Sequence, residues 1–566
     1  MYFGRGRRVN AVARADMGGG KAGGNAVKKR HAFLTIDHMG GAHSILNRKK
    51  KAFCTRIPHP YSSFLIHLCR TNMDKALEIP EIRSAIARFL GRRDMSSCIL
   101  ISRAWWSTCS VLLWQHIRFG LGFNRQPSLQ AFEQNGHHIR ELMLGSVQGL
   151  DAELEHCSNL TTLRLVGHRV AEDSLTSYME VLSQLISRNH STLRVFESDP
   201  AITPAVLRAV LSCPRLEVLE TTTTNYDEEV SDQFLRMCGQ LKRFVSAHDC
   251  MGLVKDAVGL PGLVFPNITA LSFKHPMLPD DAGSEFVPHF IAKCPQLRSL
   301  EWNFDEPFPT RIFVEETLPA CTKLESFTLC NPRIEDGEVA QVLDAMTQVK
   351  LFNVRGSVGS RSLNSFGSAS YLALQRHFAT LETIDLRGIA AVDSHVQEVL
   401  SACPNLRVIA ADEIWAKDIL DGAPWVCMGL RVFRVCIMGV ADSFIEAVFG
   451  QLSRLHQLYE LDIGRAAGVT DGLALTLGAG LGRLAGLTRL RYVSVVNTDQ
   501  TMGAEDVEWV VQHWRLTTWE GMLHIDRKQH EARAEQLRQS GILFGVYSRR
   551  EMAVAQSRLD AFKAGR

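Results

Sequence analysis

Apolar residues recur in pairs three positions apart along most of this 566-residue chain. Residues 157–163, 294–300 and 403–409 show the pattern most clearly, as Cys-x-x-Leu followed three positions later by Leu or Ile. We call the first apolar residue of each pair an anchor. The anchors are Ile139, Leu160, Leu193, Leu216, Leu241, Ile268, Leu297, Leu324, Val349, Leu381, Leu406, Leu430, Leu458, Leu490 and Leu516. They span 377 residues in 14 steps of about 27 residues, which indicates an internal repeat.

Each repeat has the pattern of one short strand followed by one helix. The apolar pair alternates with outward-facing positions, and stretches such as residues 336–346 have amphipathic helical spacing. One strand and one helix cannot cover their own apolar faces, whereas stacked copies form a continuous core and a curved solenoid. The sequence predicts an α/β fold over residues 121–520, with parallel strands on the concave face and helices outside. This period resembles that of leucine-rich repeats, which run about 20–29 residues.

Half of the 14 cysteines share one place in the repeat, three residues before an anchor. They are Cys157, Cys213, Cys238, Cys294, Cys321, Cys403 and Cys427. A small buried apolar side chain at the corner between helix and strand explains this usage better than catalysis or metal binding does.

A short helical segment, residues 77–117, precedes the repeats. Pro80 is suited to the first position of a helix and Gly91 to its end. Ile82, Ile86, Phe89 and Leu90 recur between them at helical spacing, and Asp94 is the expected N-cap of a second helix. A third helix is expected around Trp106, Cys109, Leu112 and Leu113. About 40 residues cannot bury this much apolar surface, so a neighbouring domain or a partner must cover the surplus.

This segment resembles an F-box. The resemblance is carried by Leu77, Ile79, Pro80, Glu81, Ile82, Ile86, Leu90, Asp94, Met95, Ile101, Ser102, Arg103, Trp105, Leu113 and Trp114. F-boxes dock on the Skp adaptor of Skp–cullin–F-box ubiquitin ligases, and large fungal sets of them carry leucine-rich repeats. The resemblance implies a three-helix module at 73–120 that contacts a Skp adaptor. The implied contact residues are Leu77, Ile79, Pro80, Ile82, Ile86, Leu90, Asp94, Met95, Ile101 and Trp105.

The expected function is therefore a non-catalytic substrate adaptor of an E3 ubiquitin ligase that reaches a cullin through the Skp adaptor. The alternative is a leucine-rich-repeat interaction scaffold, independent of ubiquitination, whose helical segment is only a cap.

The concave face offers a candidate surface for a protein target. The residue after each second apolar position should point into the concavity, and six of these from Leu160 onward are acidic against two basic. The expected target-binding acids are Glu197, Glu220, Glu301, Asp385 and Asp462, which would prefer a basic segment of the target. The alternative is an ordinary solvated row. Trp302, on the inward phase, is expected in the core.

Charge divides the chain at its beginning. Residues 1–72 carry 14 Lys/Arg and two acids, and the remainder carries 49 Lys/Arg and 58 Asp/Glu. The basic leader is expected to be a disordered tail; a targeting signal, or translation that starts at Met73, is an alternative. At the other end, residues 521–566 are expected to form a helical cap.

No motif in the sequence points to catalysis. Zinc-protease, nucleophile-elbow and dinucleotide-binding patterns are absent, so no enzyme activity, cofactor or metal site is expected. No secretory signal or membrane-spanning stretch is present. We expect a cytoplasmic or nuclear protein with protein partners, without membrane association and without a nucleic-acid ligand.

Overall fold

The computed structural model describes residues 77, 79–119, 128–145, 154–167, 172–222, 227–247, 251–274, 286–303, 307–330, 334–355, 366–388, 394–464, 472–496, 500–521 and 527–545. The chain forms two compact units, with the boundary between Cys109 and Ser110. The basic leader 1–72 and the last part of the expected C-terminal cap lie outside the described residues.

The first unit contains three helices among its described residues. They are α4 (Pro80–Phe89), α5 (Arg92–Cys98) and α6 (Arg103–Trp114), the last of which continues past the unit boundary. Pro80 begins α4 as predicted, because its fixed φ suits a first helical residue. The buried Arg83 links the helices, donating to the carbonyl of Leu77 at 2.9 Å and to Thr108 Oγ1 at 3.5 Å.

The predicted cap of the second helix is wrong. Gly91 is the N-cap of α5, with extended backbone angles, and Leu90 rather than Gly91 is the C-cap of α4. The chain turns from one helix to the next within two residues, so α5 starts before Asp94 is reached. Asp94 lies instead in the first turn of α5, where its negative charge interacts favourably with the positive end of the helix dipole.

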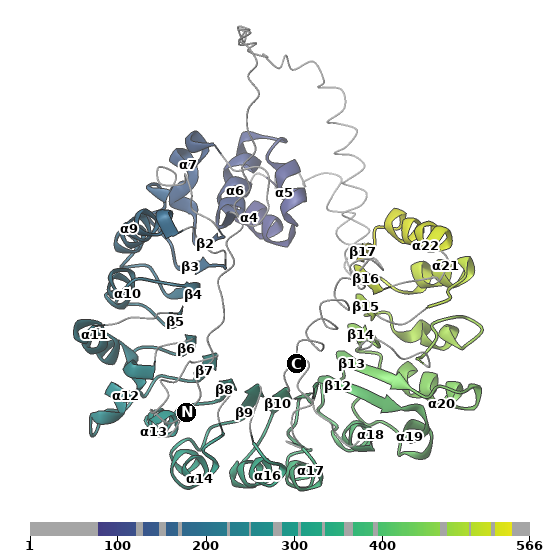
Figure 1. Cartoon of the computed structure of the whole chain (residues 1–566). Coiled ribbons are helices and arrows are strands. Elements are labelled where there is room, and N and C mark those ends of the chain that lie inside the picture. Colours follow the sequence, from purple (N-terminus) through teal and green to yellow (C-terminus); the bar gives the residue numbers. More distant parts are fainter. Residues whose placement is uncertain are drawn as a thin grey trace, which may run out of the picture. The chain divides into compact units, whose positions relative to one another are not determined.

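The second unit contains a parallel sheet of seventeen strands among the described residues. Each strand pairs with the next one along the chain, and the strands line the inner face of a curved array (Figure 1). The first nine strands are β1 (His116–Phe119), β2 (Glu141–Leu144), β3 (Thr162–Leu165), β4 (Val195–Ala201), β5 (Val218–Thr222), β6 (Arg243–Ala247), β7 (Ala270–Lys274), β8 (Ser299–Asn303) and β9 (Ser326–Cys330). The others are β10 (Leu351–Arg355), β11 (Thr383–Asp385), β12 (Val408–Trp415), β13 (Val432–Met438), β14 (Glu460–Asp462), β15 (Tyr492–Val495), β16 (Thr518–Gly521) and β17 (Leu543–Gly545).

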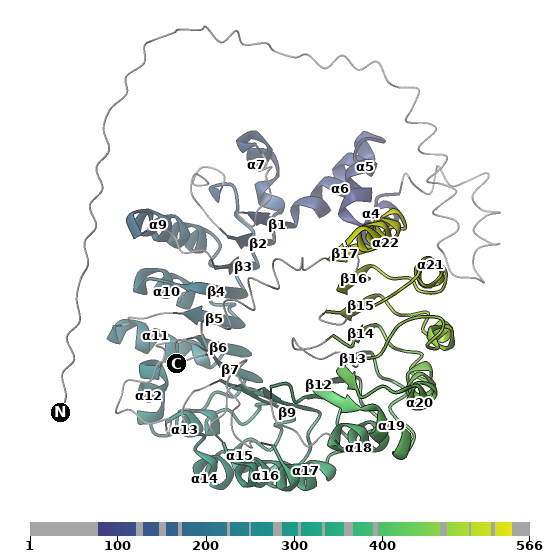
Figure 2. The same cartoon turned by 45° about the vertical axis from the view of Figure 1, so that its right-hand side comes forward.

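Helices cover the outer side of this sheet (Figure 2). They are α7 (Leu129–Asn135), α9 (Glu172–Arg188), α10 (Pro204–Leu211), α11 (Glu228–Cys238), α12 (Met251–Gly259), α13 (Phe286–Ala292), α14 (Thr310–Ile312), α15 (Leu318–Ala320), α16 (Asp336–Ala345), α17 (Ser368–Gln375), α18 (Ser394–Ala402), α19 (Ala416–Asp421), α20 (Asp442–Ser453), α21 (Ala504–His513) and α22 (Arg527–Gln539). Short 3₁₀ segments are η1 (Gly136–His138) and η3 (Leu481–Gly486), and η2 (Phe313–Thr317) is a π-helical turn between α14 and α15. The helix predicted around residues 336–346 is confirmed as α16.

The register confirms the repeat that the sequence predicts. Every anchor is buried, with Leu516 the most exposed at 7%. The second apolar residues lie opposite one another on successive strands, as with Leu300, Phe327 and Phe352 on β8, β9 and β10. Their side chains and the inner faces of the helices form one continuous core. The fold is therefore an α/β leucine-rich-repeat solenoid.

The sheet is longer than the predicted repeat region 121–520. β1 adds a strand before it, and β17 adds one after α22. The pattern of anchors does not reveal β1, because this strand begins at His116, directly after the end of α6 at Trp114, and has no anchor of its own.

The seven corner cysteines are all buried, which confirms their structural use. The thiols of Cys213, Cys294 and Cys321 donate to backbone carbonyls, as Cys321 Sγ does to the carbonyl of Ile291 at 3.3 Å. Trp302 is buried as predicted, at 1% exposure. Within the described part of the chain, no helix has the length and apolarity needed to cross a membrane.

Candidate functional site: the concave strand face

The strand register brings the predicted target-binding acids into one row on the concave face. This central row consists of Arg164, Glu197, Glu220, Val245, Ser272, Glu301, Thr328, Asn353, Asp385, Ala410, Arg434, Asp462, Ser494 and Glu520. Each residue is the register partner of the next. The alternation of a strand therefore places all of them on the same face, as the sequence pattern requires.

In the first half of the row, the chain itself supplies cations to the acids. Arg164 Nε lies 2.7 Å from Glu197 Oε2. Lys274 Nζ, on β7, lies 2.6 Å from Glu220 Oε1 on β5. Glu301 accepts a 2.7 Å hydrogen bond from the hydroxyl of Ser272. The negative charge of this half is thus partly compensated within the solenoid.

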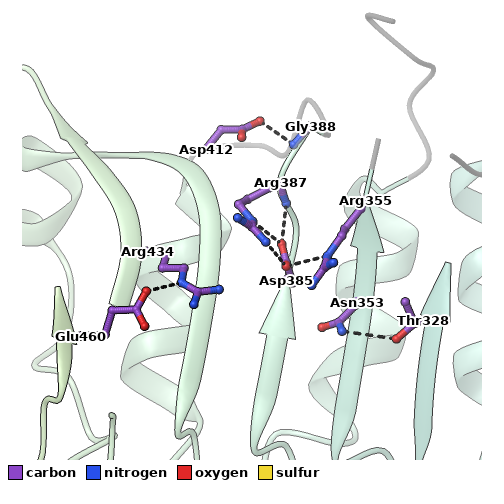
Figure 3. A network of polar contacts seen from close by, with 9 residues as sticks. All are labelled: Thr328, Asn353, Arg355, Asp385, Arg387, Gly388, Asp412, Arg434 and Glu460. Atoms are coloured by element: carbon purple, nitrogen blue, oxygen red, sulfur yellow. Dashed lines mark hydrogen bonds and ion pairs between the residues drawn. The ribbon is translucent and has the colours of Figure 1, made fainter. Parts of the chain in front are cut away.

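The second half of the row contains a cluster of arginines held by carboxylates (Figure 3). Asp385 is 3% exposed and accepts hydrogen bonds from two arginines. Arg355 donates through Nε at 2.8 Å, and Arg387 donates through Nε at 3.0 Å and Nη2 at 2.8 Å. Such charge-assisted hydrogen bonds fix both guanidinium groups against the strand surface.

A third arginine lies two strands beyond β11. Arg434 Nε, on β13, donates to Glu460 Oε1 on β14 at 2.6 Å. This hydrogen bond raises the pKa of Arg434, while the nearby charge of Arg387 acts in the opposite direction. The side chains of Arg355, Arg387 and Arg434 are all at least one third exposed. We call these three residues the arginine cluster.

The carboxylates around the arginine cluster differ in their environments. Burial acts to raise the pKa of Asp385, but the hydrogen bonds and charges of Arg387 and Arg355 outweigh it and leave the pKa below its ordinary value. Burial raises the pKa of Asp412, which accepts a 2.9 Å hydrogen bond from the backbone N–H of Gly388. Burial also raises the pKa of Asp462, to which the backbone N–H of Gly464 donates at 3.0 Å.

An amide beside the arginine cluster is incompletely satisfied. Asn353 is 9% exposed, and its Nδ2 donates to Thr328 Oγ1 at 3.3 Å. Its Oδ1 is buried and has no donor among the described residues. Figure 3 shows this oxygen on the side away from Thr328, below Arg355. A buried carbonyl without a donor costs roughly 1–3 kcal/mol.

The sequence analysis missed the most important cations of this face. Arg355 and Arg387 each lie two positions after the central row, as does Lys274. Residues two apart on a strand share a face. The same alternation that defines the central row therefore also predicts these cations on the concave face.

The helical module carries the other predicted site, the adaptor-binding residues. Ile79, Pro80, Ile82, Asp94 and Ile101 are exposed. Leu77, Ile86, Leu90, Met95 and Trp105 are half-buried. None of the ten is fully buried, so each has surface available to a partner.

The module also exposes large apolar residues that were not predicted as contacts. Phe89 is 90% exposed and Leu100 85%, and Trp106 is exposed as well. The helical spacing of Phe89 and Leu90 with Ile82 and Ile86 did not indicate which side of α4 is buried. The structure buries Arg83 and Ala87 of α4, on the side next to Leu90, and leaves Phe89 outside.

Within the described part of the chain, no group of three or more His, Cys, Asp or Glu residues has the arrangement of a metal site. The described side chains of the concave face form a polar surface, which differs from the largely apolar pockets that bind small molecules.

Sequence comparison with known families finds no matching family, and no curated protein matches the chain. Comparison with solved structures finds similar folds. The crystal structure of a Rad7–Elc1 complex from yeast aligns with 13% identity and a TM-score of 0.38, covering 80% of this chain and 96% of that one. A TLR13–ssRNA13 complex aligns with 11% identity and a TM-score of 0.34, covering 72% of this chain and 56% of that one.

Proposed function

We propose that this protein is a non-catalytic substrate-recognition subunit of a Skp–cullin–F-box ubiquitin ligase. The helical module would bind a Skp adaptor and through it a cullin, while the solenoid would hold a protein target. Proximity then brings the target to the ubiquitin-transfer machinery, so the chain needs no active site of its own. The observation that carries this proposal is an exposed apolar stripe along α4, in a segment whose sequence resembles an F-box.

The stripe consists of Ile79, Ile82, Ile86 and Phe89, at spacings of three, four and three residues. At 100° per residue Ile82, Ile86 and Phe89 lie within about 60° of one another around α4, and Ile79 is the N-cap residue of this helix. Ile79 is 45% exposed and Phe89 90%. The buried positions of α4, Arg83 and Ala87, lie on an adjacent side. The stripe therefore borders the buried side of α4 at the half-buried Ile86 and is most exposed at Phe89.

An amphipathic helix with such a face typically lies in an apolar groove of a partner. Complete burial of one large apolar side chain contributes roughly 1.5–3 kcal/mol. Several residues of this kind on one helix provide enough apolar area for specific association. The F-box resemblance assigns the groove to a Skp adaptor.

For the target, the expectation of a basic segment applies best to Glu301 and Asp462. Neither forms an ion pair with another described residue of the chain, whereas Glu197, Glu220 and Asp385 are paired with Arg or Lys. A basic segment would have to displace those intramolecular partners. Attraction of a basic segment to Glu301 and Asp462 remains a prediction.

The test is co-purification of the full chain with the Skp adaptor and a cullin from cells of its source organism. We expect wild type to recover both proteins and the double variant Ile82→Asp/Phe89→Asp to recover neither, because the two carboxylates make burial of the stripe unfavourable. Leu372→Asp is the matched control, since Leu372 is an exposed leucine on α17 of the solenoid.

Point variants are preferable to deletion of residues 77–117, because that deletion would remove part of β1. Equal, background-level recovery of the adaptor with wild type and the double variant would sink the ligase assignment and favour a ubiquitin-independent scaffold. Recovery of the adaptor without a cullin would point to an F-box role outside the ligase.

A further inference from the structure

We infer that the arginine cluster and Asn353 bind an extended peptide segment of the target. The contacts are made to negatively charged side chains of that peptide, each of which ends in an oxyanion. The oxyanion could be the carboxylate of Asp or Glu or a phosphate on a modified side chain. This inference deepens the proposed function, because the peptide would belong to the protein that the solenoid holds. It also gives the second half of the concave face a ligand preference opposite to that expected of the acidic residues.

The three arginines are each bound to a carboxylate through only part of the guanidinium group. Arg355 and Arg434 each engage a carboxylate through Nε, and Arg387 engages one through Nε and Nη2. Among the described residues, neither Nη atom of Arg355 and neither Nη atom of Arg434 has a hydrogen-bond partner. The same is true of Nη1 of Arg387. Each guanidinium is therefore fixed along one edge and keeps N–H donors for a ligand. Fixed, planar donors suit carboxylate and phosphate oxygens, which guanidinium groups bind through paired hydrogen bonds.

Asn353 provides a second and independent argument. Its buried Oδ1 is a hydrogen-bond acceptor without a donor among the described residues, on the same face as the arginines. A bare oxyanion would not satisfy it. Because this oxygen is buried, a backbone N–H of a bound peptide reaches it only when the side chains that cover it move aside, while an acidic side chain of the same peptide reaches the exposed guanidinium groups. The pairing of an unused acceptor with unused cationic donors thus favours a peptide over a free anion.

The spacing of the cluster fits an extended chain that crosses the strands. Neighbouring strands lie about 4.8 Å apart, so Arg355 on β10 and Arg434 on β13 differ by three strand spacings and two residues along the strand, roughly 16 Å in all. Alternate side chains of an extended peptide repeat about every 6.7 Å. Two acidic residues four positions apart are therefore separated by about 13 Å, which leaves a difference of about 3 Å that the long arginine side chains can span.

The arginine cluster lies among carboxylates that offset its charge. It therefore binds an anion through direct hydrogen bonds and not through long-range electrostatic attraction. Three arginines face four carboxylates, those of Asp385, Asp412, Glu460 and Asp462. Asp385 and Glu460 hold the guanidinium groups in place. Asp412 and Asp462 act on Arg387 through their charges but form no ion pair with it among the described contacts. They oppose an incoming anion, so neutralising either one should strengthen the binding of an acidic peptide.

The experiment measures binding of fluorescein-labelled peptides to the full-length protein by fluorescence anisotropy at low ionic strength. The reference peptide is Gly-Ser-Glu-Ser-Gly-Ser-Glu-Ser-Gly, and three others replace both Glu residues by Gln, Lys or phosphoserine. We expect the Glu or the phosphoserine peptide to bind, and the Gln and Lys peptides to bind at least roughly tenfold more weakly. Comparison of the Glu and phosphoserine peptides identifies the natural source of the oxyanion.

Four variants test the assignment to the cluster. Arg355→Ala and Arg387→Ala should each weaken binding roughly tenfold, and Arg355→Lys should lose less because it keeps the charge. Asn353→Leu should weaken binding without lowering Tm, since it removes the unsatisfied oxygen; a merely structural asparagine would show the reverse. The control is Arg376→Ala, on the outer side, where Arg376 forms an exposed ion pair with Asp344.

Asp462→Asn separates this inference from the expectation of a basic segment. It should strengthen binding of the Glu peptide, whereas a face that selects basic segments would bind the Lys peptide more weakly after this change. Equal binding of the Glu and Gln peptides, tighter binding of the Lys peptide, or an oligouridine that competes as well as the Glu peptide would overturn the inference. The adaptor-binding test is independent of all these outcomes, so the proposed function and this inference can fail separately.

Discussion

The helical module and the solenoid differ in how far their apolar residues are buried. In the solenoid every anchor is buried, and the second apolar residue of each repeat lies against its equivalents on both neighbouring strands. In the three helices α4, α5 and α6 of the module, only Ala87 and Cys109 are buried apolar residues among those described, while Phe89 of α4 and Leu100, just after α5, are exposed. The solenoid thus covers its apolar residues by repetition, whereas the described helices of the module leave large apolar residues exposed.

The same contrast holds for charge within the solenoid. Its concave acids are largely paired with arginines and lysines of the chain, so much of the charge predicted for recognition is used internally. Among the described residues, Glu301 and Asp462 remain without an ion pair, and unpaired hydrogen-bonding groups remain at the outer nitrogens of the arginine cluster and at Asn353 Oδ1. Counting acidic residues along a row therefore gives an incomplete picture of what the surface can bind.

The largest expected difference in stability is between replacing a phenylalanine of the solenoid and replacing one of the helical module. Phe327→Ala should destabilise the solenoid by about 3–5 kcal/mol, because Phe327 is fully buried and stacks on Phe313 at a centroid distance of 5.6 Å. Phe89→Ala should change stability by no more than about 0.5 kcal/mol. Urea denaturation of both variants measures this. A similar loss in the two variants would contradict the contrast.

A smaller effect is expected from the buried carboxylate of the arginine cluster. Asp385→Ala should cost about 1–3 kcal/mol, since it leaves two guanidinium groups without their acceptor. Asp344→Ala, at an exposed ion pair with Arg376, should cost about 0–1 kcal/mol. Thermal melting of the two variants at neutral pH gives the comparison, and an equal shift in Tm would argue that the cluster is not a fixed structure.

The sign of the pH dependence follows from the lowered pKa of Asp385. A depressed pKa in the folded state gives stability that is present above the unfolded value of about 3.9. It is lost as the pH falls through the folded value. The stability difference between wild type and Asp385→Ala should therefore be constant near neutrality and shrink in acid.

The last and smallest effect concerns the rate at which cysteine thiols are labelled in the wild-type protein. Burial raises the pKa of Cys157 and Cys403 to about 12, so at pH 8 on the order of one thiol in ten thousand is ionised. Cys98 of the module is only half-buried. Iodoacetamide followed by mass spectrometry of each site should label Cys98 before the corner cysteines, and urea should remove the difference. Early labelling of Cys157 and Cys403 in the native protein would contradict the burial of these corners.

The repeat was predictable because its signal is distributed over fifteen anchors. No single substitution or irregular loop hides such a period, and the seven corner cysteines mark the same positions independently. The central row followed from strand alternation alone. β1 and β17 were missed because each is a short strand next to a helix, at an end of the array where the period gives little support.

The parts that sequence could not supply depend on contacts between distant residues. Nothing local shows that Asp385 is shared by Arg355, thirty positions earlier, and Arg387. The exposure of Phe89 is a similar case. Its spacing is compatible with either side of α4, and the buried side is decided by Arg83, which donates to Leu77 and Thr108.

The most direct test of the central claim is a calorimetric titration of the purified Skp adaptor into the full-length protein. The account predicts saturable binding by wild type, a Kd at least roughly tenfold weaker for Phe89→Asp, near wild-type binding for Phe89→Leu, and no change for Leu372→Asp. Phe89→Leu retains an apolar side chain on the stripe, so it separates lost burial from lost folding. Absence of binding by folded wild type, or equal binding by wild type and Phe89→Asp, would contradict the assignment of the α4 stripe as the adaptor-docking face.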